Sequence, residues 1–375
     1  MGGIDHDFFQ FDHVKLSTKR QVGSVFKPIV FATALEQGIA PCEFIPASQQ
    51  TYIDDEDKEW TPRNGNNDYR VAYSMTGALA YSVNTVSVKL IQQAGVNQTI
   101  SLAKKMGISS TMPDVPSIAL GSSSISLLEM TTAYSCLANE GKVNFPYYIT
   151  SIADLDGVLI SDFVPKESGK QVLSVESAQL VRHMMQSVVN EGTASRMRWR
   201  YGVYNDMGGK TGTTQSNADG WFLGITPALV MGVWVGADDP RIRFRYTSLG
   251  QGSNTALPVA AYFMQQVNRN RSLQQIVQAK FPALPNELMQ KVDCDLYELD
   301  EELLLDIEKM ISKRDSIAQF RVQVMQIDSL AADTIVVPAE SYLEQLYRRK
   351  MRREAAQLKR DSASLAQALL RDRIE

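Results

Sequence analysis

A serine and a lysine three residues apart stand at the start of a predicted helix in the segment RQVGSVFKPIVFATALEQG, residues 20–38. Because a proline ring removes one hydrogen bond and clashes with the preceding turn, Pro28 is tolerated only in the first turn, so the helix must begin at about Ser24. Residues at i and i+3 share a helix face, which brings the Lys27 amine towards the Ser24 hydroxyl. A lysine made neutral by burial or by a nearby cation is a competent base for a serine nucleophile. The alternative is a serine N-cap beside an exposed lysine, and this segment alone leaves both open.

A second pair of polar residues, Ser82 and Asn84, lies in the turn before a helix predicted over 85–94. A hydroxyl and an amide on one side of a tight turn can relay a proton and hold a substrate carbonyl. Serine and asparagine are also favoured N-caps, which would explain both residues without any function.

The third pattern is GGKTGTTQSNADGWFLG, in which Lys210, Thr211, Gly212 and Thr213 open a predicted strand. A phosphate-binding loop is rejected, because Tyr204 stands where that motif needs a glycine. Gly212 permits close approach of a ligand backbone. A strand edge that carries Lys and Thr suits an extended peptide with a terminal carboxylate. The apolar runs that follow predict neighbouring antiparallel strands.

The order SxxK, SxN, KTG resembles the motif triplet of serine acyl transferases that bind penicillin. From residue 1 to about 268 the chain resembles the transpeptidase domain of class A penicillin-binding proteins. The segments that carry this resemblance are STKRQVGSVFKP, ALGSSSISLLEMTTAYSCLANEGK, GKTGTTQSNADGWFLGITPALVMGVWVGADD and GQGSNTALP. It implies the α/β fold of penicillin-binding proteins and serine β-lactamases, with a central antiparallel sheet flanked by helices and an all-helical subdomain.

The resemblance also implies a role for each matched residue. Ser24 is the expected nucleophile, Lys27 its base, and Ser82 the shuttle that carries the proton to the leaving amine. Asn84 is expected to hold the acyl-side amide of the substrate, and the backbone N–H groups of Ser24 and Thr213 to form the oxyanion hole. Lys210 is expected to contribute positive charge to the catalytic site. Thr211 and Thr213 are expected to bind the substrate carboxylate, and Gly212 between them belongs to the same substrate-binding group.

The implied reaction is cross-linking of peptidoglycan stem peptides at D-Ala-D-Ala through a serine acyl-enzyme, with β-lactams as covalent inhibitors and no cofactor. A class A β-lactamase is not expected, because no ExxLN string occurs and the second motif is SVN rather than SDN. A DD-carboxypeptidase remains open, since transfer to water or to an amine depends on access of the acceptor. A penicillin-binding module that is inactive as a fragment is a second alternative.

Composition narrows the partners and the chemistry. A formal net charge of -4 argues against a general nucleic-acid binder. The three histidines form no HExxH-like cluster, so no metal site is expected. Cys42, Cys136 and Cys294 are odd in number and scattered, which suits neither a disulfide scaffold nor a zinc site.

Two parts are expected along the chain: a transpeptidase domain over 1–290 and a charged helical extension over 291–375. Residues 291–308 carry eight acidic side chains against one Lys, and residues 348–360 carry seven Lys and Arg against one Glu. A solvated extension is the simpler interpretation, and a partner-binding or membrane-surface helix is the alternative.

The segment before Ser24 is short, so we expect the chain to begin inside the domain without its opening strands. It contains no secretory signal and no apolar run of membrane-spanning length. In the family a membrane anchor and a glycosyltransferase domain come first, which implies a place on the periplasmic, extracytoplasmic face of the bacterial membrane for the full-length protein.

Overall fold

The computed structural model describes residues 12–53, 59–163, 169–326 and 334–371, without the side chains of Gln215 and of residues 360–371. The chain forms two compact units, the first made of residues 1–65 and 72–297 and the second of residues 66–71 and 298–375. The functional division at residue 290 stays a prediction.

The first unit is built around an antiparallel sheet in the order β11 (Gly208–Thr213), β12 (Asp219–Ile225) and β13 (Val230–Gly236). Gly212 pairs with Trp221, and Trp221 pairs with Trp234. The antiparallel strands predicted after residue 207 are therefore confirmed, and β11 forms an edge of the sheet within the described residues.

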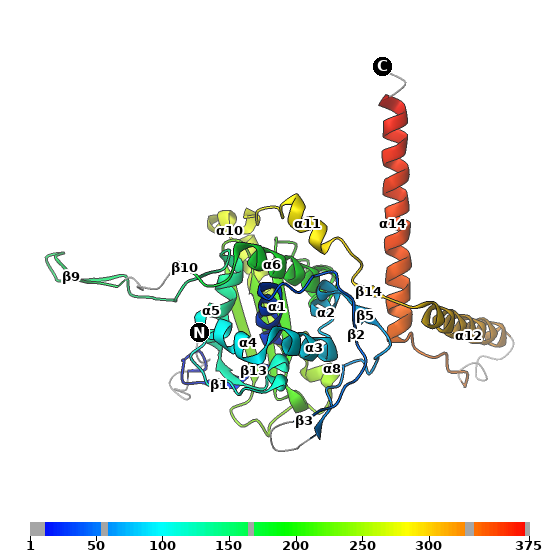
Figure 1. Cartoon of the computed structure of the whole chain (residues 1–375), viewed down its shortest axis with the longest axis horizontal. Helices are drawn as coiled ribbons and strands as arrows, with labels where there is room; N and C mark the ends of the chain where they lie inside the picture. Colours follow the sequence, from blue (N-terminus) through cyan, green and yellow to red (C-terminus); the bar gives the residue numbers. More distant parts are fainter. Residues whose placement is uncertain (1–11, 54–58, 164–168, 327–333, 372–375) are drawn as a thin grey trace. The chain divides into compact units, whose positions relative to one another are not determined.

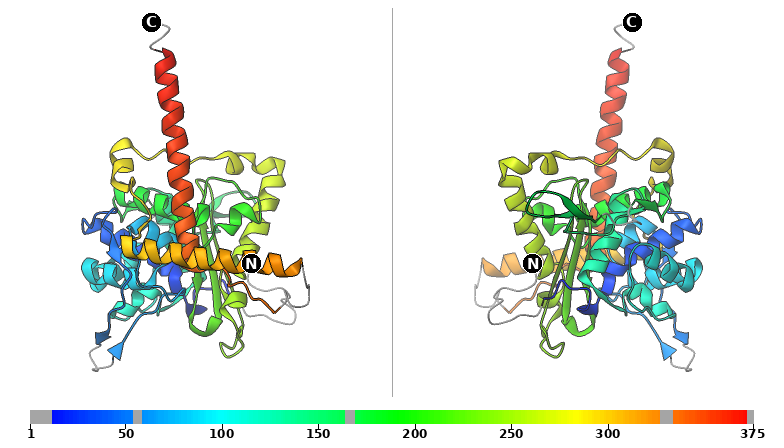
Figure 2. Two further views of the ribbon diagram at one scale, coloured as in Figure 1. Left: turned by 90° about the vertical axis from the view of Figure 1, so that its right-hand side faces the viewer. Right: turned by 90° about the vertical axis from the view of Figure 1, so that its left-hand side faces the viewer.

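Helices cover both faces of this sheet (Figure 2). On one face α5 (Leu127–Ala138) packs against β12 and β13 and α6 (Val175–Asn190) against β11, while α9 (Ala256–Arg269) packs against β12 and β13 from the other face. This is the antiparallel sheet flanked by helices that the family resemblance implies.

The helix that carries the first motif, α1 (Lys27–Glu36), lies at the centre of a helical layer (Figure 1). Its neighbours are α2 (Met75–Ala80), α3 (Asn84–Ala94), α4 (Val96–Lys105) and α6. Residues 27–34 are all buried. A helix that is apolar on every side belongs in a core rather than on a surface, so α1 forms a rigid base for the residues at its start.

Shorter elements complete the first unit. The short strands form pairs or small sheets: β1 (Lys19–Gln21) with β6 (Ser124–Ser126), β3 (Tyr52–Ile53) with β4 (Glu59–Trp60), β7 (Lys142–Val143) with β10 (Lys170–Gln171), β8 (Ser151–Ala153) with β9 (Leu159–Asp162), and β2 (Ile45–Pro46) with β5 (Ala72–Tyr73). The short helices are η1 (Gly23–Phe26), η2 (Pro116–Leu120), α7 (Arg196–Trp199), η3 (Gln215–Asn217), α8 (Thr247–Gly250), η4 (Arg271–Leu273), α10 (Gln274–Gln278) and α11 (Asn286–Val292).

The second unit contains two long helices, α12 (Glu301–Met325) and α14 (Tyr342–Arg371), which pack together. The Arg314 guanidinium pairs with the nearly buried Glu344 carboxylate between them. Tyr347 donates a hydrogen bond to Glu308 over 3.0 Å. Within the described residues, none of the helices has both the length and the apolar character that crossing a membrane requires.

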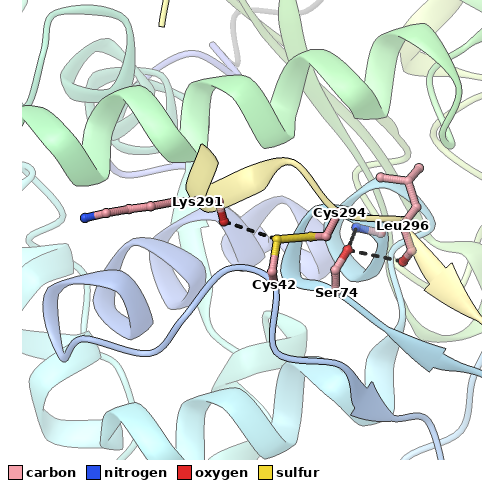
Figure 3. The surroundings of a disulfide bond; sticks show 6 residues. Cys42, Ser74, Lys291, Cys294 and Leu296 are labelled. Atoms are coloured by element: carbon pink, nitrogen blue, oxygen red, sulfur yellow. Dashed lines mark hydrogen bonds between the residues drawn. A yellow bond between two sulfur atoms is a disulfide. The ribbon is translucent and has the colours of Figure 1, made fainter. Parts of the chain in front are cut away.

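A disulfide joins Cys42, which follows α1, to Cys294, which precedes β14 (Tyr297–Glu298) (Figure 3). The bond spans 252 residues of sequence. The scattered spacing of the cysteines did not predict it, because the two sulfurs meet only through the tertiary fold. The third cysteine, Cys136, is buried and free.

A buried carboxylate fixes the start of α5. Glu129 accepts hydrogen bonds from the backbone N–H and hydroxyl groups of Ser109, Ser110 and Ser126 at 2.7–3.0 Å. Burial alone would raise the pKa of this carboxyl group, but these donors outweigh it and lower the pKa from 4.5 to about 2. Ser126 and Glu129 form a capping box, which ties the loop at 109–110 to α5 beneath the sheet.

Replacing Glu129 by Gln should lower the free energy of unfolding by about 2 kcal/mol at pH 7, because an amide N–H would then face buried donors. Since folding lowers the pKa, the carboxylate stabilises the fold fully above the unfolded pKa of 4.5 and loses that effect as pH falls through about 2. Urea unfolding should therefore show the difference between Glu129→Gln and the parent narrowing between pH 4.5 and 2. The exposed Glu43 provides the control, Glu43→Gln, and an equal loss in both variants would contradict the prediction.

Candidate functional site

Ser24 lies in the 3-10 turn η1, directly before α1, and is half-buried. It is not a helix cap, because the N-caps of η1 and α1 are Val22 and Phe26 and neither side chain makes a capping bond. Residues i and i+3 eclipse each other in a 3-10 helix, so Ser24 and Lys27 share one face. The N-cap interpretation of Ser24 is therefore wrong, and its hydroxyl is left for another use.

Lys27 is fully buried and is held from the second motif. Its Nζ donates to Ser82 O over 2.7 Å, to Ser82 Oγ over 3.2 Å and to Asn84 Oδ1 over 2.7 Å. Burial, and then the charge of Lys210, hold the pKa of Lys27 well below its ordinary value. Within the described residues Lys27 forms no hydrogen bond to Ser24, a contact that in unliganded enzymes often tightens only with substrate.

The Ser82 hydroxyl bridges two buried lysines. Lys210 Nζ donates to Ser82 Oγ over 2.9 Å and to Thr211 O over 3.1 Å. Burial lowers the pKa of Lys210 to about 7. Hydrogen bonds therefore link Lys27 through Ser82 to Lys210. Neither lysine has a carboxylate partner in the described part of the chain.

The turn that carries the second motif has an unusual backbone. Ser82 adopts a φ of +58°, a left-handed conformation that costs a non-glycine residue energy. The N-cap of α3 is Val83, whose side chain makes no capping bond. Ser82 and Asn84 are therefore not caps, and that alternative from the sequence is wrong.

Asn64 supplies the missing cap from another segment. Its Oδ1 accepts hydrogen bonds from the backbone N–H groups of Asn84 over 3.0 Å and Thr85 over 3.1 Å. The Asn84 side chain also donates to Arg63 O over 2.7 Å. The buried Asn64 thus fixes both the start of α3 and the backbone of Asn84.

Strand β11 places the third motif beside Ser24. Thr214 N donates to Asp219 O on β12, and because N–H groups alternate along an antiparallel ladder, Thr213 N–H points to the open edge. Thr213 Oγ1 accepts a hydrogen bond from Gly252 N over 3.1 Å, and Thr211 Oγ1 donates to Thr193 Oγ1 over 2.7 Å.

Glycines allow this strand to lie against the turn that carries Ser24. A Cβ at Gly23, where φ is +58°, would lie 2.8 Å from Thr213 O. A Cβ on Gly212 would lie 3.0 Å from both Val22 O and a Val25 methyl group. The close approach at Gly212 is therefore to this chain's own segment around Ser24.

A cleft of about 690 Å³ opens above these groups. Three of the predicted residues line it: Ser24, Asn84 and Thr213. Its other walls come from the β3–β4 pair with the segment after it and from the loop at 115–122. Aromatic rings Tyr52 and Trp60, 5.8 Å apart, stand on the first of these walls. The cleft is large enough for a peptide.

The structure brings together most of the predicted site. Ser24, Asn84 and Thr213 face the cleft, while the half-buried Ser82 links the buried Lys27 and Lys210. Thr211 is buried beside Thr193, and the chemical roles of all eight predicted residues remain predictions. Sequence reasoning missed Asn64, Thr193 and Gly252. For Asn64 the string PRNGNND indicated only a turn, and nothing local pointed to a cap some 20 residues away.

Replacing Asn64 by Ala should lower the free energy of unfolding by about 1–2 kcal/mol, because two N–H groups at the start of α3 lose their acceptor. Chemical denaturation measures this loss. Asn97→Ala is the matched control, since Asn97 makes one exposed hydrogen bond to Asp114. Equal stability of the two variants would show that water replaces Asn64 as the cap.

Comparison with known proteins adds an independent line of evidence. The family described as penicillin binding protein transpeptidase domain matches residues 7–239. Penicillin-binding protein 1A of Aquifex aeolicus is 33% identical over 270 residues, which are 72% of this chain and 36% of that protein. Penicillin-binding protein 1B of Haemophilus influenzae is 35% identical over 245 residues, 64% of this chain and 30% of that protein. The chain thus spans about a third of the length of these curated relatives.

Solved structures show the same fold. Penicillin-binding protein 1A from Haemophilus influenzae superposes with a TM-score of 0.67 at 24% identity, over 76% of this chain and 47% of that one. The PonA1 protein from Mycobacterium tuberculosis in complex with penicillin V gives a TM-score of 0.59 at 24% identity, over 72% and 73%. The family match covers more than half of the chain and includes all three motifs. The chain belongs to the family of penicillin-binding protein transpeptidase domains and is similar to its class A members.

Proposed function

We propose that this domain is a serine-type DD-transpeptidase that cross-links peptidoglycan stem peptides and is acylated by penicillin at Ser24. The observation that carries the proposal is the Ser82 hydroxyl, hydrogen-bonded to two fully buried lysines below a cleft that Ser24 lines. Neither lysine takes part in an ion pair with a carboxylate in the described residues, so an ion pair does not explain why they are buried there. Together with Ser82 they can supply a base, a proton relay and a cation.

Acylation begins when Ser24 Oγ attacks the carbonyl carbon of the penultimate D-alanine. Lys27, neutral because its pKa is lowered, accepts the hydroxyl proton. Ser82 lies within hydrogen-bonding distance of Lys27, so it can pass its own proton to the leaving nitrogen as the C–N bond breaks and take the proton held by Lys27 in its place. D-Alanine leaves with that proton, and the stem peptide remains as an ester on Ser24.

Substrate binds along the open edge of β11 as an added strand. The backbone N–H groups of Ser24 and Thr213 stabilise the oxyanion, and Asn84 holds the acyl-side amide. Thr213 with Thr211, on either side of Gly212, and the charge of Lys210 bind the terminal carboxylate. The alternation of N–H groups along β11 supports this arrangement, because it leaves Thr213 N–H pointing away from β12.

An amine from a second stem then attacks the ester and forms the cross-link, whereas a β-lactam leaves a stable ester on Ser24. A DD-carboxypeptidase would form the same ester and transfer it to water. The cleft volume of about 690 Å³ and its aromatic wall support room for a second peptide and favour the transpeptidase.

The Cys42–Cys294 disulfide supports an extracytoplasmic location, because such bonds persist in oxidising compartments. We therefore place the domain at the outer face of the bacterial cytoplasmic membrane, with stem peptides and β-lactams as its ligands. A membrane anchor and a glycosyltransferase domain in a longer protein remain predictions from the family resemblance.

Labelling with a fluorescent penicillin tests the proposal. The parent protein should give a covalent adduct of one label per chain, and Ser24→Ala should give none while keeping its circular dichroism spectrum. A folded parent that stays unlabelled would refute the proposal. With a stem-peptide substrate and an added amine, a cross-linked product is expected, and release of D-alanine alone would favour the carboxypeptidase.

Lys27→Ala should slow penicillin acylation by about 10²–10⁴-fold, the usual contribution of a general base. As pH falls, the rate in the parent should decline because Lys27 becomes protonated, and it should also decline above about pH 7 because Lys210 loses its charge. Lys210→Arg keeps a cation at every pH and should lose the alkaline decline. Stopped-flow rates across pH check both limbs, and an unchanged alkaline limb in Lys210→Arg would contradict the assignment.

A further inference from the structure

The first turn of α2 lies between the two chain segments that the disulfide joins (Figure 3). Met75 N donates to Pro41 O over 3.0 Å, and Pro41 directly precedes one cysteine. Ser74 N and Ser74 Oγ donate to Leu296 O over 3.2 and 3.3 Å, and Leu296 lies two residues after the other. The Lys291 carbonyl oxygen lies 3.2 Å from the Cys42 sulfur, a contact only, because a disulfide sulfur has no proton to donate.

Packing between this segment and α2 is backbone to backbone. A Cβ on Gly77 would lie only 1.6 Å from Leu296 O, so α2 has no room for a larger residue there. Just beyond, the Tyr297 ring stands edge-on to Tyr81 at 5.8 Å, and both rings lie 6.2 Å from Tyr73. Residues 294–297 therefore cover α2 from its first turn to the residue that precedes Ser82.

Helix α2 in turn fixes the second motif. Ser82 N donates to Leu79 O over 3.2 Å and Val83 N donates to Ala78 O over 2.9 Å, so the turn folds back onto the last residues of the helix. The φ of +58° at Ser82 is costly and persists only where the surroundings enforce it. A shift of α2 would move the Ser82 hydroxyl between its two lysines.

We propose that residues 294–297, fastened by the Cys42–Cys294 disulfide, position Ser82 for proton transfer and so set the rate of acylation. This inference rests on the function proposed above. The segment lies beyond residues 7–239, which match the family, so it is a contribution of this chain's C-terminal part to a site made of family motifs. Leu296 and Tyr297 act through α2 and Tyr81 and do not touch substrate.

The test compares Cys42→Ser/Cys294→Ser with the parent in penicillin acylation, resolved into the noncovalent dissociation constant and the first-order acylation rate. We expect the acylation rate to fall about tenfold, within the 10²-fold that a 1 Å misplacement can cost. The dissociation constant and the final fraction of labelled protein should not change. Dithiothreitol, which is oxidised to its cyclic disulfide as it reduces the bond to two thiols, should slow the parent equally and leave the variant unaffected.

A second pair of variants keeps the test independent of the cysteines. Tyr297→Leu removes the ring against Tyr81 and should also slow acylation. Tyr297→Phe keeps the ring and should acylate at the parent rate. A smaller labelled fraction at an unchanged rate would mean that the segment only stabilises the fold, and would overturn the proposal. Unchanged rates in all variants would overturn it too.

Two further readouts separate the possible failures. We call residues 294–297, fastened by the Cys42–Cys294 disulfide, the clamp. Alkylation of the denatured, unreduced parent should modify one thiol, that of Cys136. Modification of all three cysteines would refute the clamp, because the disulfide would then be absent. A folded parent that penicillin does not label refutes the proposed function and the clamp together. A labelled parent with unaffected variants refutes the clamp alone.

Discussion

Two lysine amines meet on one serine hydroxyl in the interior of this domain, and the rest of the site depends on that arrangement. Lys27 and Lys210 are both completely buried, and neither has a carboxylate partner in the described residues. Burying an ammonium group without a counter-charge is expensive, and proteins reduce that cost by lowering its pKa until the group is neutral. Both pKa values are lowered here, that of Lys27 partly by the other lysine. The fold thereby holds lysine amines that lose their protons more readily than exposed ones.

Three independent parts of the structure keep that arrangement in place. The buried helix α1 carries Lys27 at its first residue, and the edge strand β11 carries Lys210. Ser82 stands between them on a left-handed turn that α2 supports from one side and Asn64, which caps α3 from another segment, supports from the other. Because the hydrogen bonds to Ser82 Oγ are 3.2 and 2.9 Å, they need all three parts at once.

Patterns that depend on neighbouring residues were predictable from the sequence. Pro28 limited where the helix could begin, and the structure has α1 begin one residue before it. The apolar runs after residue 207 indicated antiparallel strands, which the register of β11, β12 and β13 confirms. The motif triplet indicated which distant segments meet. The Cys42–Cys294 bond, the Asn64 cap and the positive φ of Ser82 were not predictable, because each depends on tertiary contacts between segments with no shared local pattern.

Glycine explains how the motifs reach such short separations. Gly23 lies against the Thr213 carbonyl, Gly212 against Val22, and a Cβ at Gly252 would come within 2.3 Å of Gly212 O. A side chain at Gly23 or Gly212 would push β11 away from the turn that carries Ser24, and one at Gly252 would meet the backbone of β11 and β12. Gly121 continues the same contact, since its Cβ would lie 2.0 Å from Gly23 O. Gly23 and Gly212 are therefore required by backbone packing between the first and third motifs, which brings Ser24 and Thr213 to the same cleft.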